Sequence, residues 1–191
     1  SPDRKKLFRE AKKQFAINSQ QQYENTVLTL WQGTHREAQY QGLEVAEAYK
    51  KYRTPDSFKL YEQMLLTAEN WDTIDWIAIT LAGLLILDHK ELEAKLTEWR
   101  AHDNFWMRRS SLIAHIKHKK HTNTDLLAET ILMLSHETEF FIRKAIGWTL
   151  REYSKTDPHW VESFVQEHEN QLSGLSQREA MKIIIRNRNS A

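Results

Sequence analysis

The sequence predicts an all-α protein. Its 191 residues include only 5 Gly and 3 Pro, so chain-breaking residues are sparse. No stretch alternates apolar and polar residues for long enough to indicate a strand. Apolar residues recur instead at the three- and four-residue spacings of an amphipathic helix, as in Leu112, Ile113 and Ile116, and again in Leu126, Leu127, Ile131 and Leu134.

The predicted helices fall into pairs of similar length, with boundaries at intervals of roughly 15–20 residues. The clearest pairs are Ser57–Ala68 with Trp71–Leu87, Leu92–His102 with Phe105–Lys119, and Asp125–Leu134 with Phe140–Tyr153. This spacing predicts an α-solenoid superhelix of HEAT-like helix pairs, a single domain over residues 1–191, in which each second helix lines a concave surface. The structural alternative is a compact orthogonal bundle.

Several helix starts have recognisable capping chemistry. Thr54 and Asp157 each precede a Pro at the first position of a helix, and Ser176–Glu179 has the pattern of a capping box. The longest apolar run, Ile77–Leu87, is interrupted by Thr80 and is too short to cross a bilayer, so it is predicted to be a buried helix.

Composition excludes several classes of site. The chain has no Cys, which rules out disulfides, thiolate zinc sites and cysteine nucleophiles and is compatible with a reducing cytoplasm. It has no Gly-rich phosphate loop, nucleophile elbow or zinc hydrolase motif. The 27 Lys and Arg against 26 Asp and Glu give a formal net charge of +1, so any basic surface must come from the arrangement of the charges.

One arrangement of this kind lies between Asp103 and Asn123. Five basic residues and the single acid Asp103 give a local charge of +4, the bases being Arg108, Arg109, Lys117, Lys119 and Lys120. Such a patch could steer a polyanion, although a solvated helix end explains it equally well. The nearby His115, His118 and His121 are expected to form a solvated face, and we predict no metal site.

Three separate segments combine Trp residues with charged side chains. Trp71 and Asp75 are four residues apart and therefore share a helix face, and Trp148 is accompanied by Arg143, Lys144 and Arg151. On spacing alone, a Trp packed in the core beside a surface Asp75 is the more common arrangement. For Asp72 we expect a capping role. Gly147 indicates close approach of a neighbouring helix or of a ligand.

The chain resembles the HEAT-like-repeat DNA glycosylases of the AlkD type, which are bacterial DNA alkylation repair enzymes. The motifs that carry this resemblance are Trp71–Asp75, Asp103–Ser111, Phe140–Tyr153 and Leu175–Ala180. The resemblance implies a concave superhelix that grips alkylated double-stranded DNA and excises cationic N3- and N7-alkylated purines without flipping the base. It places the two cleft tryptophans at Trp71 and Trp148, the cleft carboxylate at Asp75 and a phosphate-contacting arginine at Arg109.

The chemistry fits these residues. A cationic purine leaves as a neutral base, so what needs stabilising is an oxocarbenium-like sugar, which indole faces and a carboxylate can supply without metal or cofactor. We expect Asp75 to lie on the concave surface, where it supports no core. Further DNA contacts are predicted for residues Lys5, Arg108, Arg143, Lys144 and Arg151. The protein is expected to be a monomer, with no membrane partner, in the bacterial cytoplasm near the nucleoid.

Two departures from the family pattern leave an alternative open. Asn70 stands where the family usually has an aromatic residue, and Ser1–Leu7 matches a segment that follows two earlier helices in the family. Those helices carry a DNA-contacting element. The chain given is therefore either trimmed, or it is a paralogue without these helices that binds DNA, or another partner, weakly and has weak or no excision activity.

Overall fold

The structure is a computed structural model that describes residues 2–190 and the side chains of residues 6–190. Within these residues every regular element is a helix, which confirms the all-α prediction. The α-helices are α1 (Pro2–Gln14), α2 (Gln20–Trp31), α3 (Arg36–Ala48), α4 (Phe58–Thr67), α5 (Trp71–Trp76), α6 (Gly83–Asp88), α7 (Glu93–Arg100), α8 (Phe105–Ile113), α9 (Thr124–Leu134), α10 (Phe140–Tyr153), α11 (Pro158–Glu167) and α12 (Gly174–Arg188). Short 3-10 turns are η1 (Lys50–Tyr52), η2 (Pro55–Ser57), η4 (Lys90–Leu92), η5 (Ala114–Lys117) and η6 (Lys119–His121).

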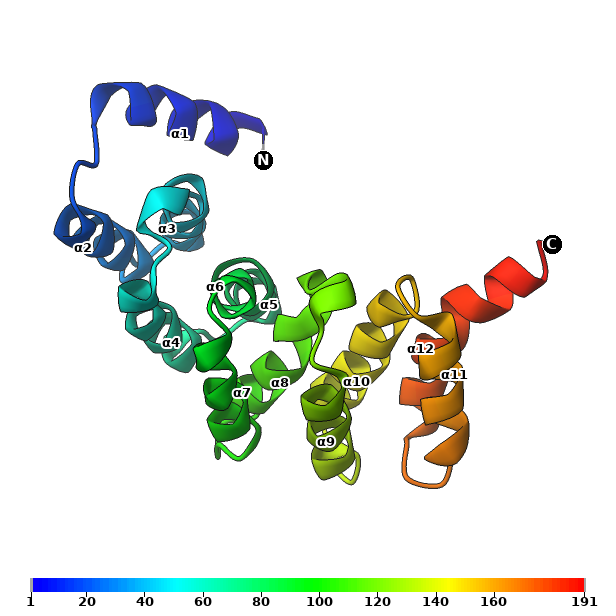
Figure 1. The fold of residues 1–191 in the computed structure, drawn as a ribbon. Coiled ribbons are helices and arrows are strands. Elements are labelled where there is room, and N and C mark those ends of the chain that lie inside the picture. The colour runs from blue at the N-terminus through cyan, green and yellow to red at the C-terminus, as the bar shows by residue number, and fades with distance from the viewer. Residues whose placement is uncertain (1, 191) are drawn as a thin grey trace.

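The helices follow one another in pairs along an open arc rather than in a compact bundle (Figure 1). Helices α2, α4, α7, α9 and α11 lie along its outer edge, and the second member of each pair lies toward the inside. Helix α1 lies beyond α3 at the N-terminal end. The predicted α-solenoid, with second helices lining the concave side, agrees with this arrangement.

The second helix of the α4 pair is continuous from Trp71 to Asp88 but changes its winding. A π-helical segment, η3 (Ile77–Ala82), joins α5 to α6, and all six of its residues are buried. The predicted buried helix is thereby confirmed. In the part of the chain that the structure describes, no helix is long and apolar enough to span a membrane.

The helix caps agree with the sequence in part. Asp157 accepts a hydrogen bond from the Trp160 amide at 2.9 Å, as predicted, whereas Thr54 makes no side-chain cap. The predicted capping box at Ser176 is wrong, because α12 begins earlier and Ser173 caps it. The Ser176 hydroxyl instead donates to the Arg143 carbonyl oxygen at 2.9 Å and ties α12 to α10.

Gly147 is explained by the same helix contact. A Cβ atom at this position would lie 2.8 Å from the Ser176 carbonyl oxygen and 2.6 Å from the Glu179 Cβ. Close packing of α12 on α10 therefore accounts for this glycine, and no ligand is required.

The expectation that the histidines form a solvated face is wrong for two of the three. His115 and His118 are only 2% and 1% exposed, and only His121 is exposed. The cause is the close approach of η5 to α6, where a Cβ on Gly83 would lie 2.5 Å from the Ala114 carbonyl oxygen. His118 Nε2 lies 2.7 Å from the Gly83 carbonyl oxygen, and burial lowers the pKa of His115 to about 3.

Candidate nucleic-acid interface

The first two turns of α5, α8 and α10 meet around a buried ion pair. Arg109 on α8 donates from Nε and Nη2 to the two carboxylate oxygens of Asp75 on α5, each at 2.9 Å. Its third nitrogen, Nη1, donates to the Phe141 carbonyl oxygen on α10 at 2.6 Å. One guanidinium therefore links three second helices, and all of its nitrogens are bonded.

Asp75 is more deeply buried than we expected. Its side chain is 11% exposed and that of Arg109 is 4% exposed, so the prediction of a surface carboxylate that supports no core is wrong. Burial raises the pKa of the Asp75 carboxyl, and the hydrogen bonds and charge of Arg109 oppose this rise only in part. The carboxylate is thus held in one orientation by a partner from a helix 34 residues away in the sequence.

The two indoles differ in their surroundings. Trp148 is partly buried, and the Arg109 guanidinium carbon lies 5.9 Å from its ring centroid. Trp71 begins α5, one turn before Asp75, and is 56% exposed. The structure thus shows the opposite of a core Trp beside a surface carboxylate: the Trp71 ring is exposed and the Asp75 carboxylate is buried. The structure brings Asp75, Arg109 and Trp148 together and leaves the Trp71 ring open to solvent on the same helix as Asp75.

The other predicted DNA-contacting cations already have partners within the protein. Arg108 makes a two-point ion pair with Glu137, and the Glu137 carbonyl oxygen accepts a hydrogen bond from Arg143. Glu179 pairs with both Lys144 and Arg151. The Lys144 hydrogen bond lowers the pKa of this carboxyl more than any other contact. The side chain of Lys5 lies outside the described residues.

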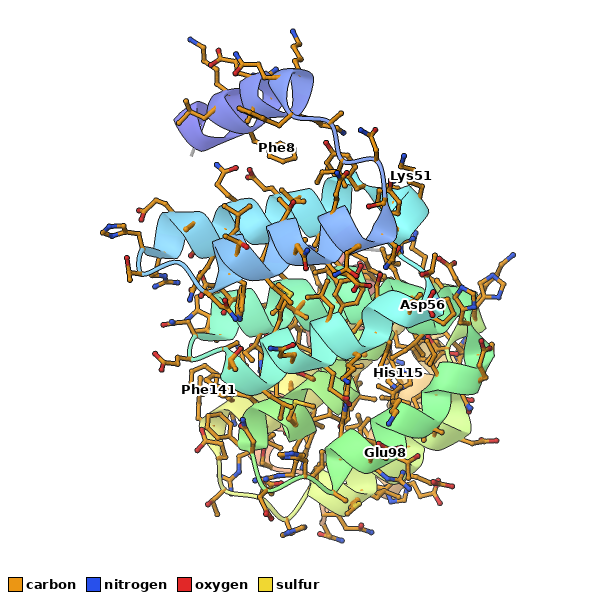
Figure 2. The ribbon with its side chains drawn as sticks, turned by 90° about the vertical axis from the view of Figure 1, so that its left-hand side faces the viewer. Phe8, Lys51, Asp56, Glu98, His115 and Phe141 are labelled. Carbon is orange, nitrogen blue, oxygen red and sulfur yellow. The ribbon has the colours of Figure 1, made fainter. Side chains whose placement is uncertain are left out.

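The basic segment predicted between Asp103 and Asn123 is not one patch. Arg108 and Arg109 lie in α8 and are ion-paired, whereas the exposed Lys117, Lys119 and Lys120 lie in and after η5. In Figure 2, Phe141, which contacts Arg109, lies at the left edge, whereas the buried His115, which precedes the lysines, lies right of centre. The local charge of the sequence is therefore divided between two surfaces.

Sequence reasoning missed an aromatic cluster at the starts of α8 and α10. The ring centroids of Phe105 and Trp106 are 4.3 Å apart, and those of Trp106 and Phe141 are 4.9 Å apart. Phe140 beside them is 56% exposed. The signal that could have revealed the cluster is an aromatic residue in the first turn of three successive second helices, beginning with Trp71.

Asp72 was also misinterpreted as a cap. No side-chain cap is made at the start of α5; Asp72 instead accepts hydrogen bonds from Arg36 and Tyr40 on α3. Among the described residues, no group of three or more His, Asp or Glu side chains is arranged to hold a metal ion.

Comparison with known proteins agrees with the resemblance seen in the sequence. A search of curated proteins found no match. A solved structure described as a predicted DNA alkylation repair enzyme from Enterococcus faecalis is 31% identical, with a TM-score of 0.82 over 95% of this chain and 84% of that one. AlkD2 from Streptococcus mutans is 17% identical, with a TM-score of 0.67 over 93% of this chain and 88% of that one. The protein smu.31 from Streptococcus mutans UA159 is 16% identical, with a TM-score of 0.69 over 93% and 91%.

The last two likenesses concern the fold alone, because their identities are low. The family model for DNA alkylation repair enzymes, however, matches residues 1–184, nearly the whole chain. This chain belongs to the DNA alkylation repair enzyme family.

Proposed function

We propose that this protein is a DNA glycosylase that excises cationic N3- and N7-alkylated purines from duplex DNA. The observation that supports this most directly is the Asp75 carboxylate held by Arg109 on the helix that presents Trp71, with Trp148 against the same guanidinium. Membership of the family supplies DNA repair as the context. The protein would act as a monomer in the cytoplasm near the nucleoid.

The proposed reaction is hydrolysis of the N-glycosidic bond. The bonding electrons leave with the purine, which is already cationic and departs neutral, so no acid catalyst is needed. The sugar carbon becomes oxocarbenium-like, water adds its oxygen there, and one proton is released. Asp75 would stabilise the developing positive charge and orient the water, and the indoles would contribute cation–π attraction.

The exposed face of Trp71 supports recognition of a base that stays in the helix. A flipped base needs an enclosing pocket, whereas an indole that is 56% exposed offers an open surface to a base pair or a deoxyribose. Asp75 lies one turn further along α5 and is much less exposed. In this proposal the lesion therefore approaches Trp71 first, and the carboxylate acts at the edge of the sugar.

The test is release of 3-methyladenine and 7-methylguanine from methylated duplex DNA by the wild-type protein, Asp75→Asn and Glu162→Gln. Glu162 is a control carboxylate, paired with Arg188 between α11 and α12. Because Asp75 is buried, each variant is assayed at a temperature where circular dichroism shows it to be folded. We expect release by the wild type and Glu162→Gln and a loss of at least about a hundredfold in Asp75→Asn. A folded wild type that binds this DNA without releasing either base would refute the proposal.

A second candidate is a non-catalytic module that binds duplex DNA weakly. The pairing of Arg108, Lys144 and Arg151 with carboxylates favours it, since these cations would have to exchange a partner to contact phosphate. A binding titration against salt distinguishes this candidate from a protein-binding role. Phosphate contacts predict affinity that falls steeply with salt, and a flat response would indicate a protein partner.

A further inference from the structure

A second arginine is bonded to Asp72, the residue after the exposed Trp71, and is held differently from Arg109. Arg36, the first residue of α3, donates from Nη2 to the two Asp72 carboxylate oxygens at 2.8 and 2.7 Å. The same nitrogen lies 2.9 Å from the Tyr40 hydroxyl, and that hydroxyl donates to Asp72. Asp72 immediately follows Trp71, so this network ties the guanidinium to the first turn of α5, which also carries the open indole.

Arg36 retains the ability to bind an anion. Its side chain is 50% exposed, whereas that of Arg109 is 4% exposed. The hydrogen bonds of Arg36 all come from Nη2, and its Nε and Nη1 donate to no residue that the structure describes. Arg109, by contrast, uses all three nitrogens inside the protein. Each of these two nitrogens can still donate a hydrogen bond to a phosphate oxygen.

The loop before α3 lies on the same side of the molecule as the candidate site. In Figure 2, the loop that joins α2 to α3 lies at the left of the molecule, as Phe141 does. The carboxylate partner of Arg36, Asp72, stands on the same helix as Trp71 and Asp75. A duplex that places a base pair against Trp71 therefore brings its backbone past the start of α3.

We propose that Arg36 binds a backbone phosphate of the duplex next to the base pair that Trp71 faces. This inference rests on the proposed function, because it names a contact for the same DNA. The hydrogen bonds of Asp72 and Tyr40 restrict the arginine to one orientation before DNA arrives, which reduces the entropy lost on binding. The Asp72 carboxylate is 24% exposed and repels the same phosphate, so it holds Arg36 at some cost to DNA affinity.

The test is fluorescence anisotropy of a labelled duplex, titrated at several salt concentrations with the wild type, Arg36→Gln and Arg188→Gln. Arg188 is the matched control, an arginine that is 60% exposed and paired with Glu162. Loss of one phosphate contact should reduce the slope of log K against log salt by about 0.9. With curves that converge at 1 M salt, this corresponds to about eightfold weaker binding at 0.1 M. Arg188→Gln should leave the slope unchanged.

A second variant separates a phosphate contact from a structural role. Asp72→Asn keeps the charge of Arg36, so a direct contact predicts that the slope of log K against log salt stays at the wild-type value. If Arg36 served only to hold Asp72 and α5 in place, Asp72→Asn and Arg36→Gln would weaken binding alike, which would overturn the inference. An unchanged slope in Arg36→Gln with intact wild-type binding would overturn it as well. Absence of any duplex binding by the wild type would instead remove the proposed function, and this contact with it.

Discussion

The buried pair of Asp75 and Arg109 should be strongly coupled in the stability of the protein. The perturbation is Asp75→Asn and Arg109→Gln, made singly and together. Each single change leaves the charge of the other partner buried without its counter-charge, and the double change removes both charges. The Arg109 bond to the Phe141 carbonyl is lost or weakened in Arg109→Gln and in the double variant.

The magnitude follows from burial. Both Asp75–Arg109 hydrogen bonds measure 2.9 Å, and the two side chains are 11% and 4% exposed. Breaking such a buried pair by removing one partner costs about 3–5 kcal/mol in the free energy of unfolding. For a chain of this size, each kcal/mol lowers Tm by about 2–4 °C, which gives a loss of about 6–20 °C. The double variant should lose less than the sum of the single variants, with a coupling energy of about 2–3 kcal/mol.

The assay is urea unfolding at pH 7, followed by circular dichroism at 222 nm. The control cycle uses Arg188 and Glu162, whose side chains are 60% and 30% exposed. An exposed pair should show a coupling energy of about 0.2–1 kcal/mol. If each single change at Asp75 or Arg109 cost less than about 1 kcal/mol, or if the two cycles gave equal coupling, the argument from burial would be refuted.

Three further predictions concern other parts of the molecule. Burial lowers the pKa of His115 to about 3, so below about pH 6.5 the unfolded chain protonates this imidazole and the folded chain does not. The free energy of unfolding in urea should therefore fall by about 2 kcal/mol between pH 7 and pH 5, and by less in His115→Gln. Gly147→Ala should cost about 1–3 kcal/mol in the same assay, because its Cβ would meet Ser176 and Glu179 on α12. Trp71→Ala should weaken duplex binding by about 1–3 kcal/mol in anisotropy titrations with little change in Tm, because its ring is largely exposed.

Each of these predictions has a matched control. His121→Gln changes an exposed histidine and should retain the full pH dependence. Gly174→Ala meets only the mobile end of the Arg178 side chain, at 3.1 Å, and should cost less than Gly147→Ala. Trp99→Ala removes an indole that is 1% exposed and should cost about 3–5 kcal/mol. Equal effects within any of these pairs would contradict the corresponding prediction.

The helices were predictable because their apolar periodicity is strong. The prediction of Phe140–Tyr153 coincides with α10, and Asp125–Leu134 differs from α9 by one residue. The π-helical winding of Ile77–Ala82 was not predictable. This run is apolar on all sides of the helix, so its sequence has no polar face whose spacing could distinguish the i to i+4 hydrogen bonds of an α-helix from the i to i+5 bonds of a π-helix. The cap of α12 was misplaced because two serines, Ser173 and Ser176, compete for that position, and tertiary contact with Arg143 engages the second.

The candidate site was predictable in its residues but not in its burial. Spacing placed Trp71 and Asp75 near one face of a helix, yet residues four apart differ by about 40° in direction, enough to separate an exposed ring from a covered carboxylate. The cover is Arg109, which comes from another helix pair, and no local pattern encodes that contact. The Arg36–Asp72 pair was missed for the same reason, since its partners come from α3 and α5.

The position of the carboxylate depends on the packing of α10. Arg109 holds Asp75 with two nitrogens and the start of α10 with the third, so a shift of α10 against α8 must strain one of these bonds. Trp148 lies on the same helix, seven residues or about two turns after Phe141, and therefore moves with it. Gly147 and Ser176 fix α12 against that helix. The orientation of Asp75 and the placement of Trp148 thus both depend on the position of α10. A buried ion pair is costly in itself, but it would be retained at a site that must be organised before the substrate binds.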